Sequence, residues 1–105
     1  GLRFAERAGL NVDTVIDVIT HGSANSWQIS NRARAMLDRN FSAGGAVGLL
    51  KKDLDICILE AQKAGLNLPV TDLVRSLYQE IIERGGSGLD AACLIELLGR
   101  DGHLN

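Results

Sequence analysis

Aromatic residues are scarce in this sequence of 105 residues: Phe, Tyr and Trp together make up only 4%. A hydrophobic core must therefore be built from Leu, Ile, Val and Ala. The hydrophobic fraction of 46% and a mean hydropathy of +0.07 predict a chain that folds. Proline occurs once, and no stretch sustains the alternation of apolar and polar residues that is typical of strands. We therefore expect residues 1–105 to form one all-α helical bundle domain.

Positive charge is not in excess, since 11 Lys and Arg residues stand against 13 Asp and Glu residues. A domain that binds nucleic acid usually carries a basic excess, so the charge balance argues against such a partner. The sequence also lacks a run of about 18 apolar residues, the minimum for a helix that crosses a membrane. We therefore predict no nucleic acid and no membrane as partners.

Cysteine is rare and catalytic motifs are missing. Cys57 and Cys93 lie in apolar runs without the spacing of a metal site. They are interpreted as two free, buried thiols in a reducing compartment such as the cytoplasm, with a disulfide as the alternative. His21 is placed at a helix end and His103 in the polar tail. Neither histidine belongs to a sequence motif of nucleophilic or metal-dependent catalysis.

Residues that start and stop helices, together with apolar spacing, predict a short leading helical segment, called the stub, and five further helices. The stub, residues 1–8, reads as the end of a helix that begins upstream, so we expect the chain to be part of a longer one. The further helices are expected at 12–20, 26–38, 47–64, 69–84 and 91–98. Residues 7–11 and 63–67 echo each other as Arg/Lys-Ala-Gly-Leu-Asn, which predicts one helix-stop geometry used twice.

The helix at 47–64 has two apolar sides, which predicts a central position in the bundle. Lys51 is expected to be solvated and to pair with Asp55. Lys52 falls in line with the second apolar stripe, formed by Leu49, Ile56 and Leu59. A lysine there is either a snorkelling or ion-paired side chain, or a cation aimed at a bound anion or cofactor.

Three other features have a structural and a functional interpretation. The segment from Gly86 to Ala91 formally matches the dinucleotide signature G-x-G-x-x-A, but no strand precedes it, so a loop is favoured. Trp27, the only tryptophan, is either a core residue or one wall of a pocket. Phe41, at the start of a loop that contains Gly44 and Gly45, has the same two interpretations.

Short segments across nearly the whole chain occur in the order and spacing of a known family. They are Ala8-Gly9-Leu10, Gly22-Ser23-Ala24-Asn25-Ser26-Trp27, Asn31-Arg32, Phe41, Lys52-Asp53-Leu54, Ala61, Gly65, Pro69, Leu77-Tyr78 and Gly88-Leu89-Asp90. Together they resemble the C-terminal domain of the β-hydroxyacid dehydrogenases. That family includes 3-hydroxyisobutyrate dehydrogenase, tartronate semialdehyde reductase and L-threonate dehydrogenase.

The resemblance implies an all-α domain packed behind an N-terminal Rossmann domain of the same polypeptide, with the active site in the cleft between them. It implies NAD or NADP as the cofactor of the full-length enzyme, a small 2- or 3-hydroxy acid as substrate, and a homo-oligomer, with this domain helping to form a dimer. Lys52 matches a lysine that contacts the cofactor near its reacting end. Trp27 and, more weakly, Phe41 match positions near the substrate.

The chain also departs from the family pattern. The lysine that transfers a proton in this family, and its asparagine partner, lie on the joining helix upstream of Gly1. No catalytic residue is therefore predicted here, and the isolated domain should be inactive. After Asp90 the family usually has a serine, where this chain has Ala91. The alternative is a free-standing helical module for protein interaction.

Overall fold

The computed structural model describes residues 1–42 and 46–99. Within these ranges the elements are α1 (Leu2–Arg7), α2 (Val12–Thr20), α3 (Trp27–Leu37), α4 (Val47–Lys63), α5 (Pro69–Glu83) and a 3₁₀ helix, η1 (Ala91–Leu98). The predicted all-α class is confirmed, and no predicted helix end is wrong by more than one residue. The predictions for Gly44, Gly45, His103 and the polar tail lie outside the described residues.

Local capping explains where these helices start and stop. The side chain of Asn11 accepts a hydrogen bond from Thr14 N at 2.9 Å and so begins α2. The repeated helix stop is also confirmed. Gly9 and Gly65 have φ of +72° and +70°, a region that favours glycine. Leu10 N bonds to Ala5 O at 3.0 Å, and Leu66 N bonds to Ala61 O at 2.8 Å, which is the Schellman arrangement at both ends.

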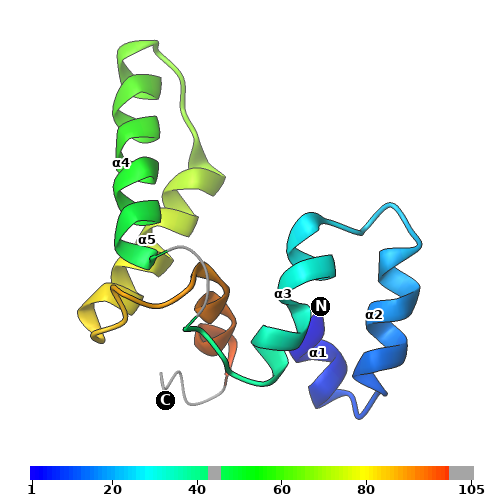
Figure 1. The fold of residues 1–105 in the computed structure, drawn as a ribbon. Helices are drawn as coiled ribbons and strands as arrows, with labels where there is room; N and C mark the ends of the chain where they lie inside the picture. The colour runs from blue at the N-terminus through cyan, green and yellow to red at the C-terminus, as the bar shows by residue number, and fades with distance from the viewer. Residues whose placement is uncertain (43–45, 100–105) are drawn as a thin grey trace.

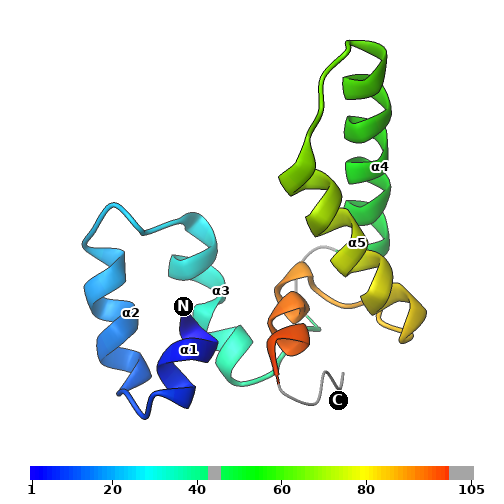
Figure 2. The same ribbon diagram turned by 180° about the vertical axis from the view of Figure 1, so that it is seen from behind.

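The helices form two groups joined by η1. Helices α1, α2 and α3 gather on one side, and the antiparallel α4–α5 hairpin projects on the other, with η1 in orange between them (Figures 1 and 2). The radius of gyration is 15.1 Å, whereas a compact domain of this size has about 13 Å. The domain is therefore open in shape. None of the helices within 1–42 and 46–99 is long and apolar enough to cross a membrane.

The buried core lies at the junction of the two groups. Val47, Ile81 and Cys93 are its largest fully buried side chains. Leu2 from α1 and Ala33 from α3 belong to the same cluster, so the core connects the start of the chain to its last helix. The hydroxyl of Tyr78 donates to the carbonyl of Ala91 at 3.1 Å. This bond ties α5 to η1.

The segment with the dinucleotide-like pattern is a loop packed on the first turn of α4. Val47 N donates to Leu89 O at 2.8 Å, and Gly48 N donates to Ser87 O at 2.9 Å. The loop therefore satisfies two of the free N–H groups at the start of α4. In a dinucleotide-binding protein such groups face phosphate, so the loop interpretation is confirmed by this packing.

Replacing Gly86 with alanine is expected to destabilise the domain by about 1–3 kcal/mol, the usual range for overpacking. An added Cβ would lie 2.5 Å from Ile81 Cγ2 and 3.1 Å from Ile81 O, and Ile81 is fully buried. Gly88→Ala is the matched control, because a Cβ there meets nothing within 4 Å. Urea denaturation of both variants tests the prediction, and equal losses would contradict it.

The prediction that α4 is central is wrong. On one apolar side Leu50 and Leu54 pack against the core, but the second stripe is open to solvent, with Leu49, Ile56 and Leu59 exposed by 64%, 49% and 52%. Cys57 is exposed as well, against the prediction, while Cys93 is buried and both thiols are free. Periodicity identifies which faces are apolar, but it does not say which of them this chain covers.

A buried carboxylate joins the first group of helices, α1 to α3, to the last helix, η1. Glu96 of η1 is only 3% exposed. Its Oε1 accepts hydrogen bonds from Arg39 Nε at 3.1 Å and from Arg3 Nη2 at 3.4 Å. Its Oε2 accepts from Arg39 Nη2. Two guanidinium groups from α1 and from the end of α3 thus neutralise one buried charge.

Candidate functional site

Lys52 lies in the second turn of α4 with its side chain exposed. Among the residues that the structure describes, it has no hydrogen bond or ion pair. Asp53, the next residue, is also exposed and unpaired within that part of the chain. The ion-paired interpretation of Lys52 is therefore not the one that the structure adopts. Within residues 1–42 and 46–99, Lys52 is thus an unpaired cation on a stripe whose other members are apolar.

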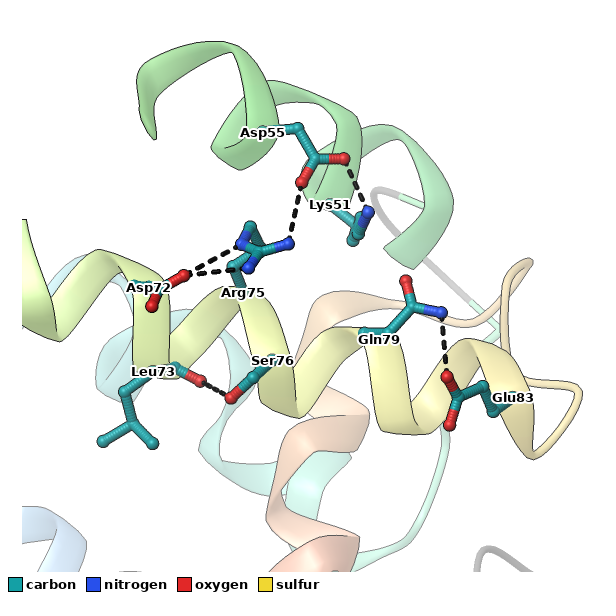
Figure 3. A network of polar contacts seen from close by, with 8 residues as sticks. All are labelled: Lys51, Asp55, Asp72, Leu73, Arg75, Ser76, Gln79 and Glu83. Atoms are coloured by element: carbon teal, nitrogen blue, oxygen red, sulfur yellow. Dashed lines mark hydrogen bonds and ion pairs between the residues drawn. The ribbon is translucent and has the colours of Figure 1, made fainter. Parts of the chain in front are cut away.

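Lys51 behaves differently from Lys52. Its ammonium lies 2.6 Å from Asp55 Oδ2, which confirms the predicted pair, although its side chain is half-buried where the sequence predicted solvation. Asp55 also meets Arg75 of α5 at 3.4 Å, and Arg75 in turn binds Asp72 at 2.9 Å (Figure 3). This network ties α4 to α5. The packing of α4 on α5, with Arg75 reaching across to Asp55, sets the direction in which the stripe with Lys52 faces.

The network lowers the pKa of Asp55, chiefly through the hydrogen bond from Lys51 and also through Arg75. A carboxyl whose folded-state pKa is depressed stabilises the fold above its unfolded pKa and loses that contribution as pH falls. We expect the stability difference between wild type and Asp55→Asn to shrink as pH falls below about 4. Urea denaturation between neutral pH and pH ~3 measures it. Asp53→Asn on the same helix is the control, and an equal pH dependence there would contradict the prediction.

Trp27 begins α3 with 62% of its surface exposed, so its interpretation as a core residue is wrong. The turn before it is tightly fixed. Ser26 caps the helix by accepting from Ile29 N at 3.2 Å, and Asn25 Oδ1 accepts from Ser26 N at 2.8 Å. The guanidinium of Arg32 lies 5.0 Å from the centre of the indole ring. This is a cation–π contact.

Phe41 has the opposite environment. Its side chain is 6% exposed and belongs to the core cluster, and its carbonyl accepts a hydrogen bond from Asp90 N at 2.8 Å. Core packing is therefore sufficient to explain Phe41, and a role in a substrate pocket stays a prediction. Asp90 confirms its predicted N-cap role, because its Oδ1 accepts from Ala92 N at 2.8 Å.

The structure does not gather the predicted residues into one pocket. Lys52 and Trp27 stand on the two separate groups of helices (Figure 1). Sequence reasoning missed an apolar cleft of about 430 Å³ between the groups, lined by residues such as Leu2, Ile29, Leu50 and Ile95. Neither Lys52 nor Trp27 lines it. The structure therefore places Lys52 and Trp27 apart from each other and outside this cleft.

Metal and histidine chemistry find little support. Within residues 1–42 and 46–99, no group of three His, Cys, Asp or Glu residues could hold a metal ion. His21 is the C-cap of α2, with Nδ1 2.7 Å from the carbonyl of Asp17. This confirms its predicted place at a helix end. His103 lies outside the described residues.

Comparison with known proteins identifies the family. Residues 1–98 match the family described as NAD-binding of NADP-dependent 3-hydroxyisobutyrate dehydrogenase. The chain belongs to this family. The resemblance inferred from the short segments is thereby confirmed.

Individual relatives agree with this assignment. An uncharacterised oxidoreductase of Shewanella frigidimarina is 40% identical over 98 residues, which cover 93% of this chain and 34% of that protein. A probable 3-hydroxyisobutyrate dehydrogenase-like protein of Arabidopsis thaliana is 36% identical over 95% of this chain and 30% of its own length. The 2-hydroxy-3-oxopropionate reductase of Escherichia coli is 32% identical over 92% of this chain and 33% of its own.

The fold agrees as well. The crystal structure of a 3-hydroxyisobutyrate dehydrogenase from Salmonella typhimurium superposes with a TM-score of 0.82 and 27% identity, over 91% of this chain and 34% of that one. The chain thus spans about a third of the length of the relatives that it matches.

Proposed function

We propose that this chain is the C-terminal helical domain of an NAD(P)-dependent dehydrogenase of small 2- or 3-hydroxy acids. It would pack against a Rossmann domain of the same polypeptide and close the cleft between the two. The observation that carries the proposal is Lys52, an exposed cation without a partner in the described chain, on a helix whose packing on α5 sets the direction in which Lys52 faces.

Lys52 fits a role at the cofactor. Its neighbours Leu49 and Ile56 are exposed apolar side chains, so a partner that covers them would exclude water around the ammonium. A lysine ammonium in such surroundings binds polar or anionic groups more strongly than in water. When bound, NAD or NADP supplies the nicotinamide that carries the hydride. The part of Lys52 is to hold the cofactor from the side of the helical domain.

Trp27 fits a place beside the substrate. Its exposed ring offers an apolar wall, and Ser26 and Asn25 fix the turn that carries it. In this proposal Phe41 supports the pocket from within the core. No residue of this chain is assigned the transfer of the proton, so we propose that the domain is inactive by itself.

A second copy of the polypeptide is proposed as a further partner. The described surface exposes large apolar side chains on several helices, among them Phe4, Val18, Val70 and Leu73. Apolar surface of this extent is typical of interfaces, and one Rossmann domain is not expected to cover helices on both groups. A homo-oligomer in which helical domains meet would cover the remainder. Two free thiols favour the cytoplasm as the compartment.

The test is an assay of the longer polypeptide that carries a Rossmann domain ahead of this chain. We expect it to oxidise one of 3-hydroxyisobutyrate, glycerate or L-threonate, with NAD or with NADP, as followed by absorbance of the reduced nicotinamide. The 105-residue chain assayed alone is the control and should show no turnover. If no hydroxy acid reacts with either cofactor, the proposal is wrong and an interaction module becomes the better account.

A further inference from the structure

The indole ring of Trp27 is exposed, yet its backbone is held firmly. Ser26 caps α3 through Ile29 N, and the side-chain amide of Asn31 donates to the carbonyl of Trp27 at 2.9 Å. These bonds fix the main chain but leave the ring free to change rotamer. Arg32, 5.0 Å from the ring centre, contacts the ring itself.

Arg32 reaches the ring because its side chain is long. Side chains on a helix lean toward its N-terminus, and Arg32 follows Trp27 by five positions on α3. A long side chain can therefore extend back to the first turn. The planar guanidinium of arginine suits an aromatic face, whereas the compact ammonium of lysine does so less well. Residue type therefore favours this contact, although residues five apart are not the usual facing pair on a helix.

Asp90 holds Arg32 in turn. The Nε atom of Arg32 lies 3.5 Å from Asp90 Oδ2, and the carboxylate is 6% exposed. Asp90 is itself fixed at two points, since its Oδ1 accepts from Ala92 N and its N–H donates to the carbonyl of Phe41, both at 2.8 Å. A buried carboxylate held in this way is a fixed anchor. The chain of contacts runs from η1 through Arg32 to the surface ring.

We propose that Arg32 is a positioning residue for the substrate: anchored by Asp90, it holds the Trp27 ring in the orientation in which the ring meets the hydroxy acid. This inference rests on the proposed function, which places Trp27 beside the substrate. Arg34, two positions along the same helix, shows the contrast. It is exposed and pairs with Asp13 of α2, so it is a second cation on α3 that does not contact the indole ring.

Fluorescence tests the positioning step without any assay of activity. Trp27 is the only tryptophan, so the emission of the 105-residue chain reports on this ring alone. We expect Arg32→Leu to shift the emission maximum and to raise quenching by acrylamide. The matched variant Arg34→Leu should change neither the emission maximum nor the quenching. Far-UV circular dichroism is the control that both variants keep their helices. An unchanged Trp27 signal in a folded Arg32→Leu chain overturns the proposal.

Two milder variants guard against loss of folding. Arg32→Lys keeps a cation near Asp90 but loses the planar stack, so its signal should lie between those of wild type and Arg32→Leu. Asp90→Asn keeps an acceptor for Ala92 N and removes the charge that anchors Arg32. It should loosen the ring as Arg32→Lys does. If both leave the fluorescence of Trp27 at its wild-type value, Arg32 does not position the ring.

Kinetics of the longer polypeptide with its Rossmann domain test the consequence. We expect Arg32→Leu to raise KM for the hydroxy acid about two- to fivefold, the range of an exposed cation–π contact, with kcat and KM for the cofactor nearly unchanged. Trp27→Ala should raise the same KM at least as far. If Trp27→Ala raises KM and Arg32→Leu does not, the positioning role fails alone. If neither variant raises KM in an enzyme that turns over, the proposed position of Trp27 beside the substrate is wrong as well.

Discussion

Replacing Lys52 with alanine is expected to reduce kcat/KM of the longer, Rossmann-containing polypeptide on the order of 100-fold, a typical cost of removing one charge-stabilising group from an active site. Lys52 is exposed and has no partner in the described chain, so its removal leaves no buried charge behind. The free energy of unfolding should change by less than about 0.5 kcal/mol. Loss of activity with unchanged stability is the signature of a residue used for binding.

Two lysines of α4 serve as controls for this experiment. Lys63 lies three turns further along α4 and pairs with Glu60 at 2.7 Å, so Lys63→Ala should leave both activity and stability nearly unchanged. Lys51→Ala removes the bond to Asp55 and should lower stability more than Lys52→Ala does. Steady-state kinetics with urea denaturation separates the three. Equal kcat/KM for Lys52→Ala and Lys63→Ala would remove Lys52 from the cofactor site.

The local features of the fold were predictable from sequence because they depend on neighbours along the chain. Asn11 caps α2, Gly9 and Gly65 end helices with positive φ, and Pro69 stands in the first turn of α5. Each of these effects acts within about one helical turn. The Lys51–Asp55 pair has the same origin, since residues four apart share one face of a helix. Such features need no knowledge of the tertiary fold.

The predictions that were wrong concern whether an apolar helix surface is covered by other parts of the chain. The two apolar stripes of α4 were identified, but whether this chain buries them depends on helices far away in sequence. Cys57 was misplaced for that reason, and Cys93 in η1 was placed correctly because the junction core surrounds it. An amphipathic helix that meets a partner has the same pattern as one that meets its own core.

The candidate site was predictable in part. Lys52 stood out because a lysine on an apolar stripe is costly without a partner or a ligand, and the described part of the chain gives it no partner. The contact between Arg32 and Trp27 was not predictable, since a spacing of five is not a standard helical pair. The pairing of Arg32 with Asp90 joins residues 58 positions apart. No local pattern records such a contact.

Glu96 is another residue that local pattern did not identify, and its removal is expected to have the largest effect on stability. Glu96→Ala should lower the free energy of unfolding by about 3 kcal/mol, because it removes the buried carboxylate that binds two guanidinium groups. Arg3 and Arg39 would lose the carboxylate that they share, while Arg3 would keep its pair with Glu6 at 2.8 Å. Their side chains are partly exposed, so water can solvate them, and the cost stays at the lower end of the usual range.

Glu96→Gln separates charge from shape. The amide keeps one acceptor oxygen for the guanidinium groups, so we expect a loss of about 2 kcal/mol, smaller than for alanine. Glu60→Ala is the control, since its exposed pair with Lys63 is worth at most about 1 kcal/mol. Urea denaturation followed by circular dichroism measures all three. If Glu96→Ala and Glu60→Ala lose the same stability, the ion pairs of Glu96 do not hold η1 to the first group of helices.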